Sequence, residues 1–224
     1  MSFSRSAGVS LMGLGLFRFH LSLFTFVLFG ALVNLTALKA QAADYTILAF
    51  GDSLTAGYRL PQGDGFPEQL EKKLQAMDRD IRVINAGVSG DTTQGGLARL
   101  NWALADKPDM VILELGANDA LRGIEPTLTR KNLDQMIVQL KSNNIKVLLA
   151  GMLAPPNMGE EYADAFNAIY PTLAKTHGVT LYPFFLEGVA GHSSLNLDDG
   201  IHPTREGVSV IVERILPYVL KVID

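Results

Sequence analysis

A serine near one end of the chain and an aspartate–histidine pair near the other are residue types that nucleophilic catalysis requires. Ser53 stands in Gly51-Asp52-Ser53-Leu54, directly after an apolar run. A serine hydroxyl does not ionise by itself at neutral pH and needs a general base. Asp199 and His202, three residues apart, can supply the base and the carboxylate that orients it. These residues predict a serine hydrolase.

Five short apolar runs alternate with helical patterns, and this alternation predicts a parallel sheet with helices on both faces. The expected strands are Tyr45–Phe50, Ile81–Asn85, Met110–Leu115, Lys146–Ala150 and Thr180–Tyr182. The expected helices are Phe66–Met77, Gly95–Ala105, Pro126–Ser142, Glu160–Thr176 and Thr204–Leu220. Because proline lacks the backbone N–H and clashes inside a helix, we expect a kink or a break at Pro171 and at Pro217.

The candidate polar residues share one position, because each follows an expected strand. Ser53 follows the first strand, residues 85–91 the second and residues 116–119 the third, and the Asp199/His202 pair comes after the fifth. The carboxyl ends of parallel strands lie along one edge of a sheet, where ligands bind. Attack on an ester places negative charge on the carbonyl oxygen, and the two middle segments could supply hydrogen-bond donors to it.

Each candidate also has an ordinary structural role. A serine after a strand often caps the next helix, Asn118 suits a turn, and Gly90 permits a positive φ. Among the other histidines, His177 closes a helix, where a cation is favoured by the helix dipole, and His192 lies in a Gly/Ser-rich loop and is expected to face solvent. The shared position at one sheet edge favours the catalytic interpretation for Ser53, Gly90 and Asn118.

The first part of the chain has the pattern of an export signal. An apolar stretch spans residues 21–33, and Ala40-Gln41-Ala42 offers a cleavage site. A stretch this short fits the core of a signal peptide better than a bilayer span. We expect residues 1–42 to be a signal peptide and residues 43–224 to be a single domain. An uncleaved N-terminal anchor is the alternative, and Met12 is an alternative start to Met1.

The net charge limits which partners the protein is expected to bind, and the cysteine content indicates its compartment. Without the leader, 16 lysines and arginines face 23 acidic residues, a formal charge of −7. Such a chain is a poor candidate for binding nucleic acid or an anionic membrane surface. The sequence has no cysteine, which excludes disulfide and thiolate chemistry and suits a bacterial periplasm. We expect a periplasmic or secreted protein with no stable membrane insertion after signal cleavage.

Four segments, in order, resemble the conserved blocks of the GDSL or SGNH hydrolases, and the resemblance covers essentially the whole expected mature chain. These blocks are Gly51-Asp52-Ser53-Leu54-Thr55-Ala56-Gly57-Tyr58, Asn85-Ala86-Gly87-Val88-Ser89-Gly90-Asp91-Thr92, Glu114-Leu115-Gly116-Ala117-Asn118-Asp119 and Asp198-Asp199-Gly200-Ile201-His202-Pro203. Two further segments, Leu121-Arg122-Gly123 and Ala168-Ile169-Tyr170-Pro171, resemble the family's bacterial periplasmic members with thioesterase, lysophospholipase and arylesterase activity.

The resemblance implies a role for each candidate. Ser53 is the expected nucleophile, His202 the base and Asp199 the carboxylate that holds the imidazole. The backbone N–H groups of Ser53 and Gly90 and the side-chain amide of Asn118 are the expected oxyanion hole. The implied fold is a three-layer α/β/α sandwich of flavodoxin-like type with a five-stranded parallel sheet. No metal ion or cofactor is expected, and we expect a monomer.

The expected substrates are small esters and thioesters with an apolar acyl group, namely aryl esters, acyl-CoA and lysophospholipids. The loops 120–126 and 153–159 are apolar, which favours a longer acyl chain. A carbohydrate acetyl esterase is one alternative and would have a small, polar acyl pocket. A non-catalytic flavodoxin-like module that binds a phosphorylated ligand at residues 51–57 is another, but it leaves Asp199 and His202 unexplained.

Overall fold

A computed structural model describes residues 45–224, and five strands in this part of the chain form one parallel sheet. The strands are β1 (Tyr45–Gly51), β2 (Ile81–Gly87), β3 (Met110–Glu114), β4 (Lys146–Ala150) and β5 (Thr180–Tyr182). Their order across the sheet is β2-β1-β3-β4-β5, and every neighbouring pair is parallel. This is the strand order of flavodoxin-like folds. The expected signal peptide lies outside the described residues.

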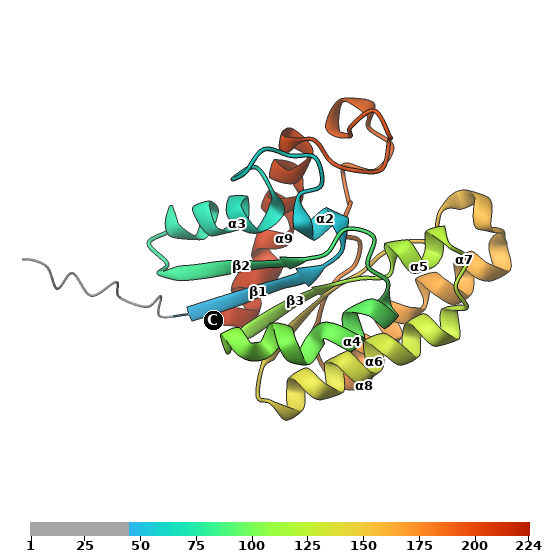
Figure 1. The fold of residues 1–224 in the computed structure, drawn as a ribbon, viewed down its shortest axis with the longest axis horizontal. Helices are drawn as coiled ribbons and strands as arrows, with labels where there is room; N and C mark the ends of the chain where they lie inside the picture. Colours follow the sequence, from blue (N-terminus) through green and yellow to red (C-terminus); the bar gives the residue numbers. More distant parts are fainter. Residues whose placement is uncertain (1–44) are drawn as a thin grey trace, which may run out of the picture. The chain divides into compact units, whose positions relative to one another are not determined.

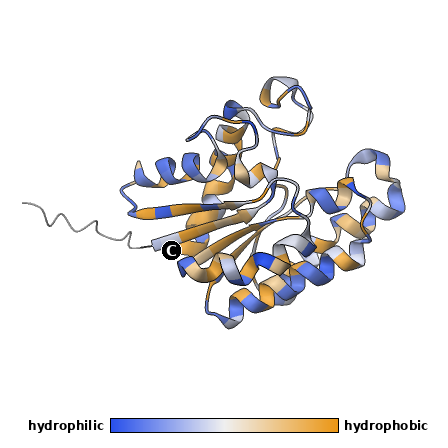
Figure 2. Ribbon diagram, viewed as in Figure 1, coloured by the Kyte–Doolittle hydropathy of each residue, from blue (hydrophilic) through white to orange (hydrophobic). Residues whose placement is uncertain are grey.

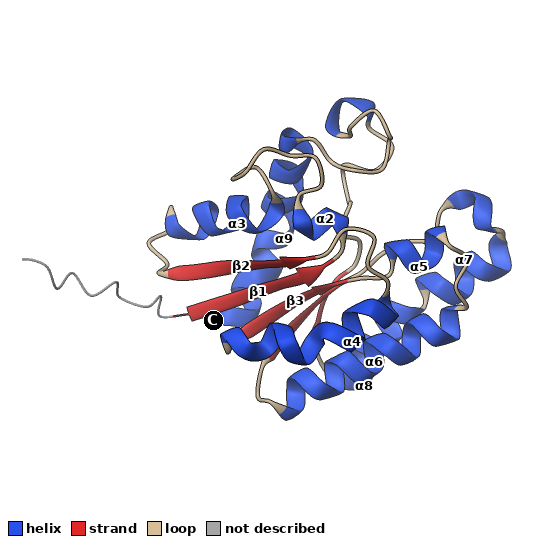
Figure 3. Ribbon diagram, viewed as in Figure 1, coloured by secondary structure: helices blue, strands red, loops and turns tan. Residues whose placement is uncertain are grey.

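Helices connect the strands and cover both faces of the sheet (Figures 1 and 3). The α-helices are α2 (Ser53–Ala56), α3 (Phe66–Gln75), α4 (Thr93–Ala103), α5 (Ala117–Leu121), α6 (Pro126–Ser142), α7 (Glu160–Asn167), α8 (Ile169–His177) and α9 (Arg205–Ile223). The 3-10 helices are η2 (Leu104–Asp106), η3 (Pro156–Met158) and η4 (Ser193–Leu195). Helices α3 and α9 pack together on one face, and α4, α6 and α8 pack on the other. The expected three-layer α/β/α sandwich is confirmed.

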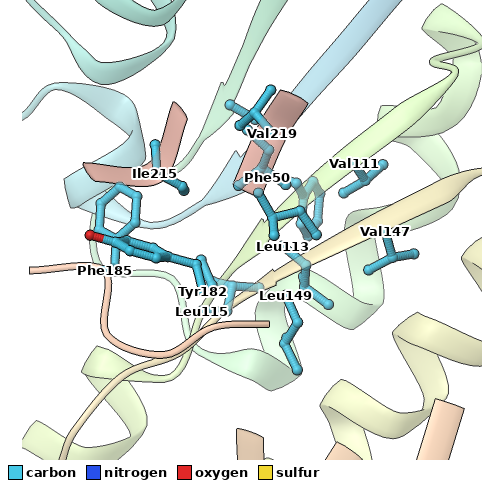
Figure 4. Packing of buried hydrophobic residues seen from close by; sticks show 14 of the residues in the cluster. Phe50, Val111, Leu113, Leu115, Val147, Leu149, Tyr182, Phe185, Ile215 and Val219 are labelled. Atoms are coloured by element: carbon cyan, nitrogen blue, oxygen red, sulfur yellow. The ribbon is translucent and has the colours of Figure 1, made fainter. Parts of the chain in front are cut away.

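The central strands are largely apolar because helices cover both faces of the sheet, and their charged residues, such as Glu114 and Lys146, lie at the strand ends. In Figure 2 the strands are mostly hydrophobic, with hydrophilic positions on the edge strand β2, whereas the helices carry polar residues on their outer sides. Leu113 of β3 and Leu149 of β4 are completely buried, and they belong to one cluster with Ile215 and Val219 of α9 (Figure 4). This core fixes the sheet whose carboxyl edge carries the candidate residues.

The two prolines expected to disturb helices have different outcomes. The helix expected over Glu160–Thr176 is two helices, α7 and α8, which separate at Ala168. Pro171 then falls in the first turn of α8, where its missing N–H needs no partner within the helix. Helix α9 continues through Pro217, so of the expected kink or break the break does not occur. Buried residues on both sides of Pro217, such as Leu216 and Val219, hold this segment against the core.

Element boundaries differ from expectation mainly at the functional edge. Strands β1 and β2 extend to Gly51 and Gly87, beyond the ends expected at Phe50 and Asn85.

The described residues belong to one compact unit, Ala43–Asp224. Within residues 45–224, no helix combines the length and the apolar character needed to span a bilayer.

Candidate active site

Ser53, His202 and Asp199 form a continuous hydrogen-bonded chain. The Ser53 Oγ atom lies 2.9 Å from Nε2 of His202, and Nδ1 of His202 lies 2.9 Å from Oδ2 of Asp199. The other carboxylate oxygen of Asp199 accepts the backbone N–H groups of Ile201 and His202. Desolvation of Asp199 opposes its ionisation, but the hydrogen bonds from the His202 backbone and ring prevail and lower its pKa to about 2. Asp199 is therefore a charged, fixed partner for the imidazole.

The turn between β1 and α2 presents Ser53 at the first position of a helix. The Asp52 side chain caps this helix by accepting the Leu54 N–H at 2.9 Å. A Cβ atom on Gly51 would lie 2.1 Å from Oγ1 of Thr55 and 2.5 Å from Oε2 of Glu114. Only glycine fits this position, and this explains the residue type at the start of the Gly-Asp-Ser-Leu motif.

Ser53, Gly90 and Asn118 bring hydrogen-bond donors to the same edge. Ser53 begins α2, so its N–H has no partner within that helix. Gly90 lies in the loop after β2 with φ 81°, and its N–H donates no hydrogen bond within residues 45–224. Asn118 lies in α5, and its Nδ2 atom donates to Oδ2 of Asp52 at 3.0 Å. One amide hydrogen of Asn118 remains after this bond.

Arg99 of α4 joins the ends of β1 and β2 to the loop that holds Gly90. Its guanidinium donates to the carbonyl of Gly51 at 2.9 Å, to the carbonyl of Ala86 at 2.9 Å and to Oδ2 of Asp91 at 2.7 Å. It also lies 4.0 Å from the ring centroid of Phe50. The sequence alone does not predict this role of Arg99, because a lone arginine within a helical pattern gives no local signal.

Asp119 connects α5 to two other helices from a fully buried position. Its carboxylate accepts the backbone N–H of Thr93 at 2.8 Å and the Thr129 hydroxyl at 3.1 Å. The Thr93 hydroxyl also donates to Asp119 and accepts a hydrogen bond from Asn132 at 3.0 Å. Asp119 thus cross-links α4, α5 and α6, which a turn role alone would not give.

Two buried carboxyl groups, those of Asp52 and Glu114, lie at the turn that carries Ser53. Asp52 and Glu114 are both completely buried. Burial is the main cause that raises the pKa of Asp52 to about 6, and the hydrogen bonds from Leu54 and Asn118 and the charge of His202 oppose it. Burial, followed by the charge of Asp52, raises the pKa of Glu114 well above its ordinary value.

Aromatic residues support the site from two sides. The Tyr58 ring lies 4.4 Å, centroid to centroid, from the His202 ring at an interplanar angle of 37°. The hydroxyl of buried Tyr170 donates to the Leu115 carbonyl at 2.9 Å, directly after β3. Gly116 has φ 124°, and a Cβ atom there would lie 2.1 Å from the Tyr170 hydroxyl. Tyr170 and Gly116 together therefore fix the segment that leads to Asn118.

A cavity of about 410 Å³ opens beside Ser53, and most of its wall is apolar. Its lining includes Ser53, Asn118 and His202 together with apolar side chains: Leu54, Leu121, Met152, Leu153, Pro155, Pro156, Phe184, Leu186 and Ile201. The two loops expected to be apolar both contribute to this wall. Ile124 and Met158, which belong to the same loops, are not among the lining residues.

Within residues 45–224, the two other histidines have a structural role or face solvent. His177 ends α8, as expected, and its Nε2 atom also lies 2.7 Å from Oδ1 of Asp134. His192 is exposed, in agreement with the expectation. Within residues 45–224, no group of three or more His, Cys, Asp and Glu side chains is arranged to hold a metal ion.

A flavodoxin-like α/β sheet with a hydrogen-bonded serine, histidine and aspartate at its carboxyl edge is typical of serine hydrolases. Residues 49–210 match the GDSL-like Lipase/Acylhydrolase family, and the chain belongs to this family.

Several relatives are similar over most of the chain. The chain is 44% identical over 198 residues to thioesterase 1/protease 1/lysophospholipase L1 of Escherichia coli (strain K12), and this match covers 88% of this chain and 90% of that protein. It is 41% identical over 192 residues to esterase TesA of Pseudomonas aeruginosa, with 85% and 96% covered. The crystal structure of AlinE4, an SGNH-hydrolase family esterase, is similar with a TM-score of 0.68 at 47% identity, and 79% of this chain and 95% of that one are covered.

Proposed function

We propose that this protein is a serine esterase that hydrolyses carboxylic esters and thioesters through an acyl-enzyme on Ser53. The observation that carries the proposal is the hydrogen-bonded chain from Ser53 through His202 to Asp199, with 2.9 Å at each of its two contacts. In the proposed mechanism His202 accepts the Ser53 proton, and Asp199 stabilises the imidazolium that forms.

The reaction then proceeds in two acyl-transfer steps. The Ser53 oxygen attacks the substrate carbonyl while Nε2 of His202 takes the hydroxyl proton. The tetrahedral intermediate collapses, His202 gives the proton to the departing alcohol or thiol, and the acyl group remains on Ser53 as an ester. Water, deprotonated by His202, attacks this ester, and collapse releases the carboxylic acid and restores the Ser53 hydroxyl.

The oxyanion of each intermediate is stabilised by three donors: the backbone N–H groups of Ser53 and Gly90 and the side-chain amide of Asn118. Their free hydrogens support this assignment, since the Gly90 N–H has no partner in the described part of the chain and Asn118 uses one amide hydrogen on Asp52. Fixed donors of this kind stabilise the charge that develops on the carbonyl oxygen.

The cavity beside Ser53 indicates which acyl groups the enzyme accepts. About 410 Å³ of mostly apolar space exceeds what an acetyl group fills and suits a longer or aromatic acyl chain. The proposed substrates are therefore aryl esters, acyl-CoA thioesters and lysophospholipids, and the cavity disfavours a carbohydrate acetyl esterase.

Labelling and substitution of Ser53 test the proposal. An organophosphonate should label Ser53 and no other serine, as read by mass spectrometry of the digested protein. Ser53→Ala should lose at least about a thousandfold in kcat and keep its melting temperature. Ser142→Ala, at the exposed end of α6, is the matched control and should keep full activity. Turnover by Ser53→Ala at the wild-type rate would overturn the proposed function.

We also propose that residues 1–42 are removed on export and that residues 43–224 act as a single domain in the periplasm or outside the cell. The apolar stretch 21–33 and the Ala-x-Ala site support this. N-terminal sequencing of the exported protein should give Ala43 or Asp44, and a chain that keeps residues 21–33 in the membrane fraction would indicate an anchor. Light scattering of the purified mature protein should give the mass of a monomer.

A further inference from the structure

Glu114, the last residue of β3, is a buried acid that the proposed reaction does not use. Its Oε2 atom accepts the Thr55 hydroxyl at 2.8 Å and the backbone N–H of Asp52 at 3.4 Å. Its Oε1 atom is buried and has no hydrogen-bond partner within residues 45–224. A charged carboxylate with such an oxygen is strongly disfavoured, whereas a neutral acid can place its hydroxyl there.

The neighbouring carboxyl group of Asp52 is better suited to carry a charge. Its Oδ1 atom accepts the Leu54 N–H at 2.9 Å, and its Oδ2 atom accepts Nδ2 of Asn118 at 3.0 Å. Both oxygens of Asp52 therefore have donors, while Glu114 has donors on one oxygen alone. Two adjacent buried carboxyl groups do not both ionise readily. This places the negative charge of the pair on Asp52.

We propose that Glu114 is a neutral positioning residue for ester hydrolysis. It binds residues on both sides of Ser53, the backbone N–H of Asp52 and the hydroxyl of Thr55, and it leaves the negative charge of the buried pair on Asp52. The charged Asp52 then orients the Asn118 amide. This inference rests on the proposed function, because it assigns a cause to the orientation of a proposed oxyanion donor.

The orientation of Asn118 matters because an amide presents opposite charges on its two sides. The Asp52 carboxylate attracts the NH₂ group and repels the amide oxygen, so it selects one of the two amide orientations. In that orientation the second Nδ2 hydrogen is free to meet the oxyanion. The opposite orientation would offer an oxygen to a developing negative charge and would raise the barrier.

The groups around Asp52 and Glu114 agree with a single negative charge, carried by Asp52. The charge of His202 lowers the pKa of Asp52, whereas the charge of Asp91 raises it. Burial raises the pKa of Tyr170 above its ordinary value, so it remains a neutral hydroxyl. The charge on Asp52 is thus held mainly by the N–H donors of Leu54 and Asn118.

Substitutions of Glu114 test whether it acts as a neutral acceptor. Glu114→Gln keeps an uncharged acceptor of the same shape, so kcat should stay within about threefold of wild type. Glu114→Leu removes the acceptor and should lower kcat at least about tenfold with little change in KM. Glu71→Gln is the matched control, since the Glu71 carboxylate accepts a backbone N–H from Val83 at 2.6 Å on β2. An equal loss in the Gln and Leu variants would show that the charge itself is required and would overturn the proposal.

Thr55→Val removes the donor of the hydrogen bond between Thr55 and Glu114. It tests the positioning role of Glu114 if the Glu114→Leu variant does not fold. The Thr55→Val variant should lose several-fold in kcat at unchanged KM. Wild-type kcat in this variant would mean that the contact between Thr55 and Glu114 does not position Ser53.

A double-mutant cycle tests the action through Asn118. Asp52→Asn should lower kcat about ten- to a hundredfold without lowering the melting temperature. In an Asn118→Ala background the same change should cause no further loss, because the amide that Asp52 orients is gone. Losses that multiply would overturn this step.

Phosphonate labelling separates the two proposals. Absence of label on Ser53 in the wild type would refute the proposed function itself. Labelling of the wild type at Ser53, with an unchanged rate in Asp52→Asn, would refute this inference and leave the function standing. The expected result is labelling at Ser53 that is at least about tenfold slower in Asp52→Asn and close to wild type in Glu114→Gln.

Discussion

The guanidinium of Arg99 donates a hydrogen bond to the backbone carbonyl of Gly51, two residues before Ser53, at 2.9 Å. The same side chain holds the carbonyl of Ala86 and the carboxylate of Asp91, the residue after Gly90. One arginine therefore joins the loop that carries the proposed nucleophile to the loop that carries a proposed oxyanion donor. This geometry needs a planar group whose donors are spread over several nitrogen atoms. Lysine has a single ammonium nitrogen instead.

Arg99→Lys should therefore lower both stability and catalysis. Lysine keeps the charge but cannot reach three acceptors at once. The loss of hydrogen bonds from a charged, largely buried group should reduce the free energy of unfolding by about 2 kcal/mol, and kcat should fall about tenfold. Thermal unfolding and steady-state kinetics measure the two effects. Arg79→Lys, at an exposed ion pair with Asp224, is the control and should change neither. Wild-type kcat in Arg99→Lys would exclude a role in positioning.

Asn118 variants distinguish an oxyanion donor from a turn residue. Removal of one donor costs about 3–4 kcal/mol of transition-state stabilisation, so Asn118→Ala should lower kcat about a hundred- to a thousandfold at nearly unchanged KM. Asn118→Asp should lose at least as much, because it places a carboxylate where negative charge develops. A purely structural role predicts a lower melting temperature and nearly normal kcat instead. If both variants keep more than about a tenth of wild-type kcat, the assignment is wrong.

A larger side chain at the rim of the cavity should shorten the acyl chain that the enzyme accepts. Ala190 lines the cavity and is exposed, so a larger side chain there does not disturb the core. Ala190→Trp should reduce kcat/KM for p-nitrophenyl esters of long acyl chains at least about tenfold and leave acetate or butyrate esters within about threefold. Ala76→Trp, at the exposed end of α3, should change neither. Equal losses for short and long chains would show that the acyl group does not extend past Ala190.

The sequence was sufficient to predict the architecture because the relevant signals are local. Each strand of the sheet is a short apolar run, and each named site residue follows such a run. The confirmed strand alternation then placed Ser53, Asn118 and His202 at one edge. The prolines show the limit of local rules, since Pro217 lies in a helix that continues because its neighbours Leu216 and Val219 are buried.

Residues that support the site through long-range contacts could not be predicted in the same way. Glu114 ends an apolar strand, and nothing in the sequence shows that its carboxyl group meets Thr55, which lies 59 residues away. Arg99 reaches Gly51 across 48 residues. Such contacts depend on the packing of elements against one another, so they become visible in the folded structure alone.

The raised pKa of Asp52 predicts that catalysis and stability oppose each other at this residue. Burial raises its pKa from 3.8 to about 6 in the folded protein. An acid with a raised pKa binds its proton more tightly when folded, so ionised Asp52 destabilises the fold at neutral pH. This cost begins to fall as the pH drops below about 6 and is lost only below about 4, the range of the unfolded pKa. The shift corresponds to about 3 kcal/mol at most, and the loss of one hydrogen bond in Asp52→Asn offsets about 1 kcal/mol of it.

Asp52→Asn should therefore melt several degrees above the wild type at pH 8, although its kcat is lower, and the difference should shrink towards pH 4.5. Asp199 does not mask this effect, because its pKa of about 2 means that its stabilising contribution is lost only as the pH falls below about 4. Melting temperatures of both proteins at pH 8, 6.5 and 4.5 provide the measurement. A difference that is independent of pH, or a variant less stable than the wild type at pH 8, would show that Asp52 does not carry a destabilising charge in the folded protein.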